Sequence, residues 1–144
     1  MKINIKFILI HIFLPIFFGG TIYILFRTKD LLMFKWFYSL GLYNFINSLR
    51  NIFYQYKYLI PKGIIFSLPD ALWVYSFTMF LSLFFENFFT ISFVFLVSII
   101  VEIFQLNFVT GTFDVNDLIY MFLFYLFAIY ILKKEKKKWR GRFF

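Results

Sequence analysis

Long apolar runs separated by short polar breaks fill most of this chain. The clearest runs cover residues 7–26, 68–85, 88–106 and 116–132. A helix needs about 20 mainly apolar residues to cross a hydrocarbon core of roughly 30 Å. The pattern therefore predicts an all-α, polytopic membrane helical bundle with about four transmembrane helices.

Residues 31–62 fit this scheme less well. The stretch is apolar for its length, but it carries Lys35, Asn44 and Asn47. It fits an amphipathic or re-entrant segment at the membrane interface, and it also fits a fifth, less apolar span. We favour the interfacial or re-entrant interpretation, which leaves four spans.

Small residues and polar breaks indicate how the runs bend and connect. Pro15 and the pair Gly19–Gly20 predict a kink or a close helix contact in the first run. Only Glu86 and Asn87 separate the second run from the third. These two runs are therefore expected to form a tight hairpin.

Helix caps are expected at the start of the second and fourth runs. Ser67 and Asp70 have the spacing of a capping box, which predicts a helix that begins near residue 67. Asp114 is expected to be the N-cap of the last helix, with Asp117 in its first turn. All three acids thus have a purely structural interpretation as well as a functional one.

The composition supports a membrane protein and excludes several kinds of site. The 144 residues are 62% hydrophobic, whereas soluble domains average about 45–50% apolar residues. The chain has no cysteine and one histidine, His11, so disulfides, thiolate ligands and a typical zinc site are excluded. His11 is expected to face the bundle or the interface, and no cofactor is predicted.

The basic residues define a domain and a tail. Six Lys or Arg lie between Arg27 and Lys62, seven lie between Lys133 and Arg142, and none lies in between. Basic residues close to span ends favour the cytoplasm, so we predict one transmembrane domain (residues 1–132) and a cytoplasmic tail (residues 133–144). Four spans place the N-terminus on the same side, although the first basic group then lies in an outside loop.

This topology brings four of the five acids between Gly63 and Leu132 to the outer membrane face. Glu102 and Gln105 share a helix face, and Glu102 near a helix C-terminus opposes the helix dipole. Intramembrane carboxylates usually face the bundle or a water-filled cavity. We therefore predict an outward-facing acidic pocket, with Ser67, Trp73 and Tyr75 flanking it and with these residues as its lining: Asp70, Glu102, Gln105, Asp114 and Asp117.

The segment 98–121 resembles the signature of the VanZ-like family, which are small bacterial multi-helix membrane proteins. The family pattern is broadly E-x2-Q-x5-R-x2-D-x2-D-x3-N, and Glu102, Gln105, Asp114 and Asp117 match it in type and spacing. The resemblance implies a multi-pass protein of the bacterial inner membrane that acts in the cell envelope. It does not imply a defined reaction, and we do not extend to this chain the glycopeptide resistance associated with the family's namesake.

Two positions depart from that pattern. Gly111 stands where the family usually has Arg, and Met121 stands where it usually has Asn. Without an arginine the acids need another source of compensation. Three remain open: a raised carboxyl pKa, a base from elsewhere, with Arg50 the first candidate, or a bound cation.

Three classes of function compete for the predicted pocket. The favoured one is binding of an envelope ligand, such as a lipid head group, a glycan carrier or a partner protein. The alternative is a small membrane carrier for a cation or solute. An enzyme is the least supported, because the chain has no Ser–His pair, metal motif, phosphate loop or nucleophile elbow. The expected partner is the lipid bilayer and not nucleic acid, because the basic tail adjoins a span.

Overall fold

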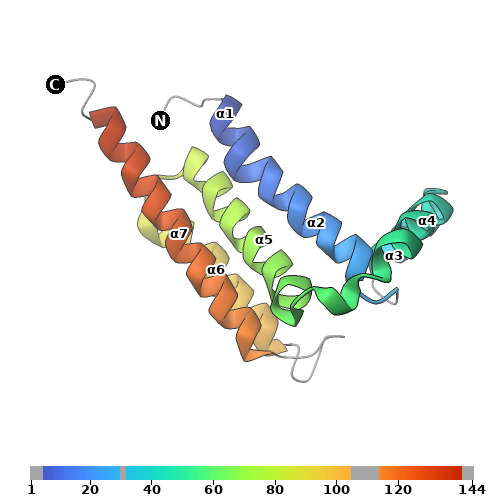
Figure 1. Cartoon of the computed structure of the whole chain (residues 1–144). Coiled ribbons are helices and arrows are strands. Elements are labelled where there is room, and N and C mark those ends of the chain that lie inside the picture. Colours follow the sequence, from blue (N-terminus) through green and yellow to red (C-terminus); the bar gives the residue numbers. More distant parts are fainter. Residues whose placement is uncertain (1–4, 30–31, 105–113, 141–144) are drawn as a thin grey trace.

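The computed structural model of the chain describes residues 5–29, 32–104 and 114–140, and in these ranges it contains helices and no strands. The helices run in an up-and-down order, and α5 lies between α2 and α7 (Figure 1). The elements are α1 (Ile5–Ile8), η1 (Leu9–Phe13), α2 (Leu14–Phe26), α3 (Leu32–Ser39), α4 (Tyr43–Tyr54), η2 (Lys57–Leu59), α5 (Lys62–Phe84), α6 (Phe88–Phe104) and α7 (Val115–Arg140). The predicted all-α class is confirmed.

Three of these helical segments are long and apolar enough to cross a membrane. They cover Ile5–Phe26, Lys62–Phe84 and Val115–Glu135, with 22, 23 and 21 residues. The fourth apolar helix, α6, has 17 residues, which corresponds to about 25 Å at 1.5 Å per residue. The structure is therefore compatible with a multi-pass membrane protein and shows three candidate spans, fewer than the four predicted.

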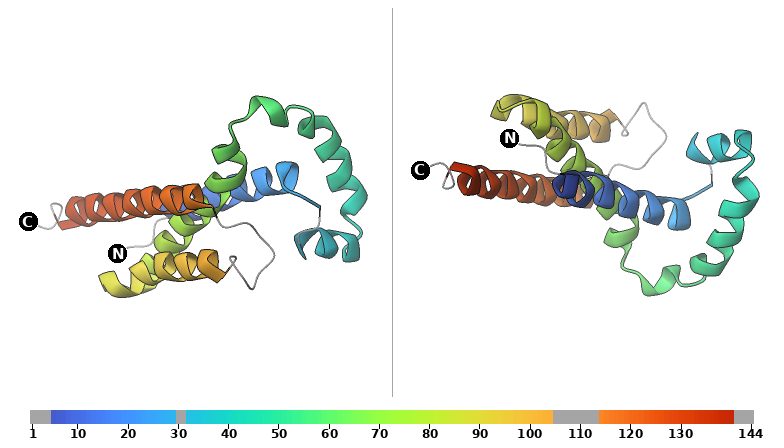
Figure 2. Two further views of the ribbon diagram at one scale, coloured as in Figure 1. Left: turned by 90° about the horizontal axis from the view of Figure 1, so that it is seen from below. Right: turned by 90° about the horizontal axis from the view of Figure 1, so that it is seen from above.

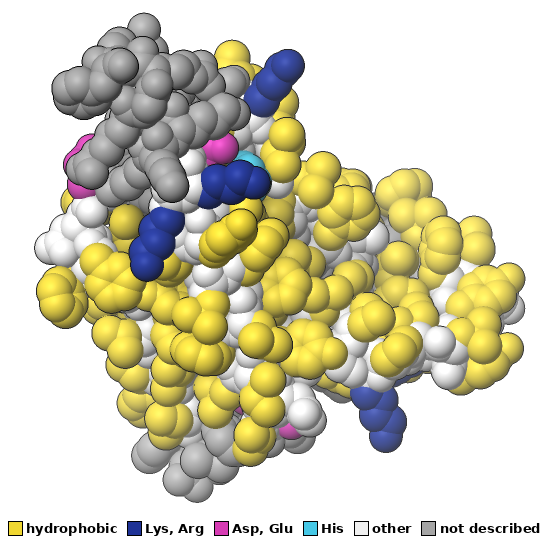
Figure 3. All heavy atoms as spheres, turned by 60° about the vertical axis from the view of Figure 1, so that its left-hand side comes forward, with side chains coloured by type: hydrophobic (Ala, Val, Ile, Leu, Met, Phe, Trp, Pro, Cys, Tyr) yellow, Lys and Arg dark blue, Asp and Glu magenta, His cyan; other side chains and the backbone are white. Residues whose placement is uncertain are grey.

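The outer surface of the helices is strongly apolar. Large hydrophobic side chains point away from the bundle, and Phe17 and Phe89 are 70% and 80% exposed. Hydrophobic side chains cover most of the face drawn in Figure 3. Contiguous apolar surface of this extent is rare on soluble monomers and suits contact with lipid.

Helix α5 forms the centre of the bundle because small residues let its neighbours approach. A Cβ atom added to Gly19 of α2 would lie 3.3 Å from the carbonyl oxygen of Pro69, whereas one added to Gly20 would meet nothing within 4 Å. Ala71 on α5 and Ala128 on α7 are fully buried. Of the two expectations for the glycine pair, close packing is thus seen at Gly19.

The start of α5 corrects one prediction from the sequence. The helix begins at Lys62, and the N–H groups of Ile64 and Ile65 already donate to the carbonyl oxygen of Pro61. Ser67 therefore lies inside the helix and is not its N-cap, so the predicted capping box is wrong. Pro61 explains the earlier start, since its fixed φ angle and extended ψ suit the residue that precedes a helix.

The stretch between α2 and α5 forms two short helices in place of one span. They have 8 and 12 residues, too few to cross a bilayer, and they are separated by a turn in which Gly41 has a φ angle of 70°. Figures 1 and 2 show α3 and α4 beside the lower end of α2, away from the other helices. A continuous fifth span is therefore not formed.

The predicted tail does not begin as a separate segment. Helix α7 continues through Lys133 and ends at Arg140, so the first basic residues extend the last helix. The beginning of α1 and the end of α7 lie at the same end of the bundle (Figure 1). This arrangement matches an even number of membrane crossings.

Candidate functional site

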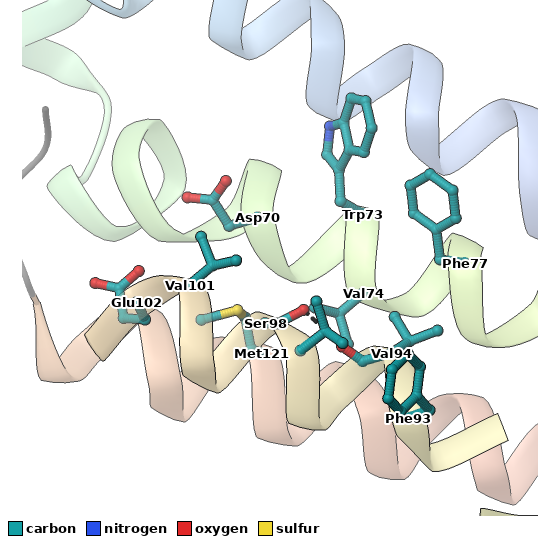
Figure 4. Close-up of a pocket in the computed structure, with 11 residues that line it drawn as sticks. Asp70, Trp73, Val74, Phe77, Phe93, Val94, Ser98, Val101, Glu102 and Met121 are labelled. Atoms are coloured by element: carbon teal, nitrogen blue, oxygen red, sulfur yellow. Dashed lines mark hydrogen bonds between the residues drawn. The ribbon is translucent and has the colours of Figure 1, made fainter. Parts of the chain in front are cut away.

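A groove of about 430 Å³ lies between α5, α6 and α7. Figure 4 shows its side chains, with two carboxylates towards one end and aromatic rings towards the other. We call this the groove; it is lined by Asp70, Trp73, Val74, Phe77, Phe93, Val94, Val97, Ser98, Val101, Glu102 and Met121. Its volume is within the range typical of small-molecule sites.

The walls of the groove are apolar because three helices place their hydrophobic residues there. Trp73 and Phe77 are about one turn apart on α5, and they are 42% and 40% exposed. Ser98 adds little polarity, since its hydroxyl donates to the carbonyl oxygen of Val94 at 2.9 Å. The groove thus has a hydrophobic length and one acidic end.

Glu102 is held at that acidic end by the start of α7. Its side chain is 4% exposed, and Oε1 accepts a hydrogen bond from the backbone N–H of Asp114 at 3.1 Å. This contact brings the last turn of α6 to the first turn of α7.

Arg27 supplies the positive charge beside these acids. Its guanidinium lies 3.9 Å from a carboxylate oxygen of Asp70 and stacks over the rings of Tyr23 and Phe66. It also acts electrostatically on Glu102 and Asp117. Arg27 was not predicted from the sequence, although it is the first basic residue after an apolar run.

Arg50, the base expected to serve this role, lies elsewhere. It is 4% exposed on α4, donates to the carbonyl oxygen of Ile24 at 2.5 Å, and stacks over Phe34 and Tyr54. Burial lowers the pKa of its guanidinium from the ordinary value. Arg50 therefore attaches the α3–α4 arm to the end of α2 and does not compensate the acids.

Asp114 and Asp117 begin α7 in two different roles. Asp114 is the N-cap, as predicted, because its Oδ1 accepts a hydrogen bond from the N–H of Asn116 at 2.9 Å. Asp117 is 5% exposed, and the Ser67 hydroxyl lies within hydrogen-bonding reach of its carboxylate. Its Oδ1 atom is buried and has no hydrogen-bond partner among the described residues.

A second cavity, of about 480 Å³, adjoins this start of α7. We call it the polar pocket; it is lined by Arg27, Lys62, Gly63, Phe66, Ser67, Asp114, Asn116, Asp117 and Tyr120. It shares no lining residue with the groove. The single acidic pocket predicted from the sequence is therefore divided, with Asp70 and Glu102 in the groove and Asp114 and Asp117 in the polar pocket.

Tyr75, predicted to flank the site, lines neither cavity. Tyr75 is 5% exposed and its hydroxyl lies 2.6 Å from Nδ1 of His11, so it belongs to the core between α5 and η1 and does not flank the site. The prediction failed because Trp73 and Tyr75, two residues apart, lie on different faces of a helix. Gln105 lies outside the described residues.

A metal centre finds no support in the geometry. Within residues 5–29, 32–104 and 114–140, no group of three or more His, Asp or Glu side chains is placed to hold a metal ion.

Comparisons with family models, curated proteins and solved structures found no match to this chain. The functional argument therefore depends on the groove and the polar pocket themselves.

Proposed function

We propose that this chain is an integral membrane protein that binds an amphiphilic envelope ligand in the groove. The observation that carries the proposal is the acidic end of an otherwise hydrophobic cavity, formed by Asp70 and Glu102. The apolar part of the ligand would lie along the valines and aromatic rings. Its polar part would meet the two carboxylates.

The polar part of such a ligand carries hydrogen-bond donors. Carboxylates only accept hydrogen bonds, and the described acids outnumber the nearby cation, because Asp70, Glu102 and Asp117 all interact with Arg27. Hydroxyl groups of a glycan and an ammonium group both satisfy this requirement. A lipid head group or a glycan carrier is thus the favoured class.

The proposed arrangement in the membrane has four spans, with α6 as the short one. The alternating directions of the long helices and the common end of α1 and α7 support it (Figure 1). The excess of Lys and Arg after Leu132 favours a cytoplasmic location for that end. The acidic ends of the groove and the polar pocket then face outward.

The α3–α4 arm is proposed to lie at the outer interface. Its exposed side chains include several large aromatic and aliphatic ones, with Trp36 and Tyr38 at 59% and 75% exposure. Trp and Tyr are enriched where the hydrocarbon meets the head groups. This placement also gives the basic residues of the outside segment a contact with lipid phosphate.

Membership of the VanZ-like family remains a proposal supported by the signature alone. A hydrogen bond joins Glu102 and Asp114 of that signature. The spacing between these two residues therefore has a structural reason. Arg27 lies 3.9 Å from Asp70 and supplies a positive charge beside the acids, which the arginine of the family pattern would otherwise supply. We propose no antibiotic resistance for the chain.

Lipid retention by matched α6 variants tests the proposed groove. Val97 lines the groove, whereas its neighbour Leu96 is 54% exposed and lies outside it. We expect Val97→Trp to fill the groove and to remove a lipid that co-purifies from native membranes, as measured by native mass spectrometry. Leu96→Trp should retain that lipid, and equal retention by both variants would refute the groove as a binding site.

A further inference from the structure

Two residues that line the polar pocket, Asp117 and Arg27, each have one buried side-chain atom without a hydrogen-bond partner among the described residues. Oδ1 of Asp117 needs a hydrogen-bond donor, and Nε of Arg27 needs an acceptor; neither has one among the described residues. Asp117 is 5% exposed. A buried polar atom left unpaired costs about 1–3 kcal/mol, more when it is charged. A ligand that offers both a hydrogen-bond donor and an acceptor beside Asp117 and Arg27 would meet both requirements.

The charges around the pocket are separated by element. Arg27 follows α2 and Lys62 opens α5, whereas Asp114 and Asp117 open α7. Oδ1 of the Asp114 carboxylate already accepts hydrogen bonds from both nitrogens of Asn116 in the first turn of α7, each at 2.9 Å. Of the two carboxylates in the pocket, Asp117 is the one with a buried oxygen, Oδ1, that accepts no hydrogen bond from the described residues; Arg27 and Lys62 are the cations that line the pocket.

The pocket wall is also shaped to present a hydroxyl group. A Cβ atom added to Gly63 would lie 2.7 Å from the hydroxyl oxygen of Tyr120, closer than real Cβ atoms approach. Glycine at this position therefore leaves room for the Tyr120 hydroxyl at the wall between α5 and α7. This hydroxyl can donate to a second oxygen of an anionic ligand.

We propose that the polar pocket binds a small zwitterion that joins a primary ammonium to a phosphate. The ammonium lies at Asp117 and fills the missing donor. The phosphate lies at Arg27 and Lys62, because phosphate pairs well with guanidinium and ammonium groups and uses the free Nε. The source is either the head group of an ethanolamine phospholipid or a free phosphomonoester of the same chemistry.

The proposal distinguishes a primary ammonium from a quaternary one. Oδ1 of Asp117 needs an N–H donor, which ethanolamine has and choline lacks. Because the groove and the polar pocket share no lining residue, this inference does not depend on the proposed function. Arg27 also pairs with Asp70 of the groove, so Asp117→Asn and Lys62→Gln are the variants that separate loss of zwitterion binding from loss of groove lipid.

Titration calorimetry of the purified full chain in detergent, with O-phosphoethanolamine as the probe, tests the site. We expect binding that is weakened at least tenfold for phosphocholine and for ethanolamine, each of which lacks one half of the chemistry. Asp117→Asn and Arg27→Gln should each weaken binding about tenfold or more, as expected for a lost charge-assisted contact. The matched controls are Glu86→Gln and Lys134→Gln, both exposed and at the opposite end of the bundle.

Lys62→Gln keeps the proposal falsifiable if the buried variants do not fold. Lys62 is exposed at the first residue of α5, so its replacement leaves the core intact and should still reduce phosphate binding severalfold.

Nanodiscs of ethanolamine or choline phospholipid show whether the ligand is a lipid head group or a free phosphomonoester. Retention of ethanolamine lipid, but no binding of the free probe, would assign a lipid head group. No discrimination between ethanolamine and choline in either assay, or equal binding by all variants, would overturn the proposal.

Discussion

The Glu102 carboxylate accepts a hydrogen bond from the backbone N–H of Asp114, 12 residues further along the chain. This contact resolves the unfavourable position of an acid near the C-terminal end of α6. The negative charge lies beside the first turn of α7, where the helix dipole favours an anion. Glu102 thus opposes one helix dipole and complements the next.

This relationship predicts different effects for two replacements of Glu102. Glutamine keeps an oxygen that can accept from Asp114, whereas alanine leaves the N–H without a partner. We expect Glu102→Ala to lower the free energy of unfolding by about 1–3 kcal/mol, and Glu102→Gln to lower it by less than about 1 kcal/mol. Denaturant unfolding in detergent measures both. An equal loss in the two variants would show that charge, and not the hydrogen bond, stabilises this contact.

The N-cap of α7 gives a second prediction. Replacing Asp114 with alanine removes the acceptor for the N–H of Asn116 and should reduce the free energy of unfolding by about 0.5–2 kcal/mol. Asp114→Asn keeps a capping oxygen and should retain most of the stability. Because Asp114 also lines the polar pocket, the asparagine variant tests in the same sample whether its charge contributes to binding.

The contact between α2 and α5 gives a third prediction, with a control in the next residue. Leucine at position 19 would collide with the backbone of Pro69 and with Leu72, whereas leucine at position 20 would extend into open space. Gly19→Leu should therefore destabilise the bundle by about 1–3 kcal/mol through overpacking. Gly20→Leu should change the unfolding midpoint little, and a large change there would contradict the proposed packing.

The sequence predicts the helices better than it predicts how they group their polar residues. Apolar run length was sufficient to locate α2, α5, α6 and α7, because burial in hydrocarbon requires continuous hydrophobicity. Asp114 was assigned correctly as a cap because capping depends on residues two or three positions away. The local sequence pattern therefore predicts the helices and most of their ends. The exception is α5, which begins at Lys62, directly after Pro61, and not near residue 67.

The candidate site was predicted only in part, because it depends on contacts between distant segments. Four acids were expected in one pocket, yet helix rotation directs Asp70 and Glu102 into the groove and Asp117 into the polar pocket. The choice between Arg27 and Arg50 needed the packing of α2 and α4, which no local pattern encodes. The only sequence signal in favour of Arg27 was its position directly after an apolar run.

A polar contact inside the bundle supports a fourth prediction. The Tyr75 hydroxyl and Nδ1 of His11 lie 2.6 Å apart, among side chains that are otherwise apolar. A double-mutant cycle with Tyr75→Phe and His11→Phe should give a coupling free energy of about 0.6 kcal/mol, and at most about 1.7 kcal/mol, the range found for such bonds in membranes. A coupling of zero would mean that each group finds another partner when its neighbour is removed.

The absence of cysteine from the sequence makes α7 suitable for a decisive topology test. Val115, which is 57% exposed, and the exposed Lys134 lie near the two ends of this helix, about 29 Å apart at 1.5 Å per residue. We expect an impermeant thiol reagent to label Val115→Cys in intact spheroplasts and Lys134→Cys only after lysis. The reverse pattern would place the groove's acidic end and the polar pocket in the cytoplasm, and the ligand search would then move to cytoplasmic molecules. Labelling of both positions from one side would mean that α7 does not cross the membrane, because two sites this far apart along a spanning helix cannot face the same compartment.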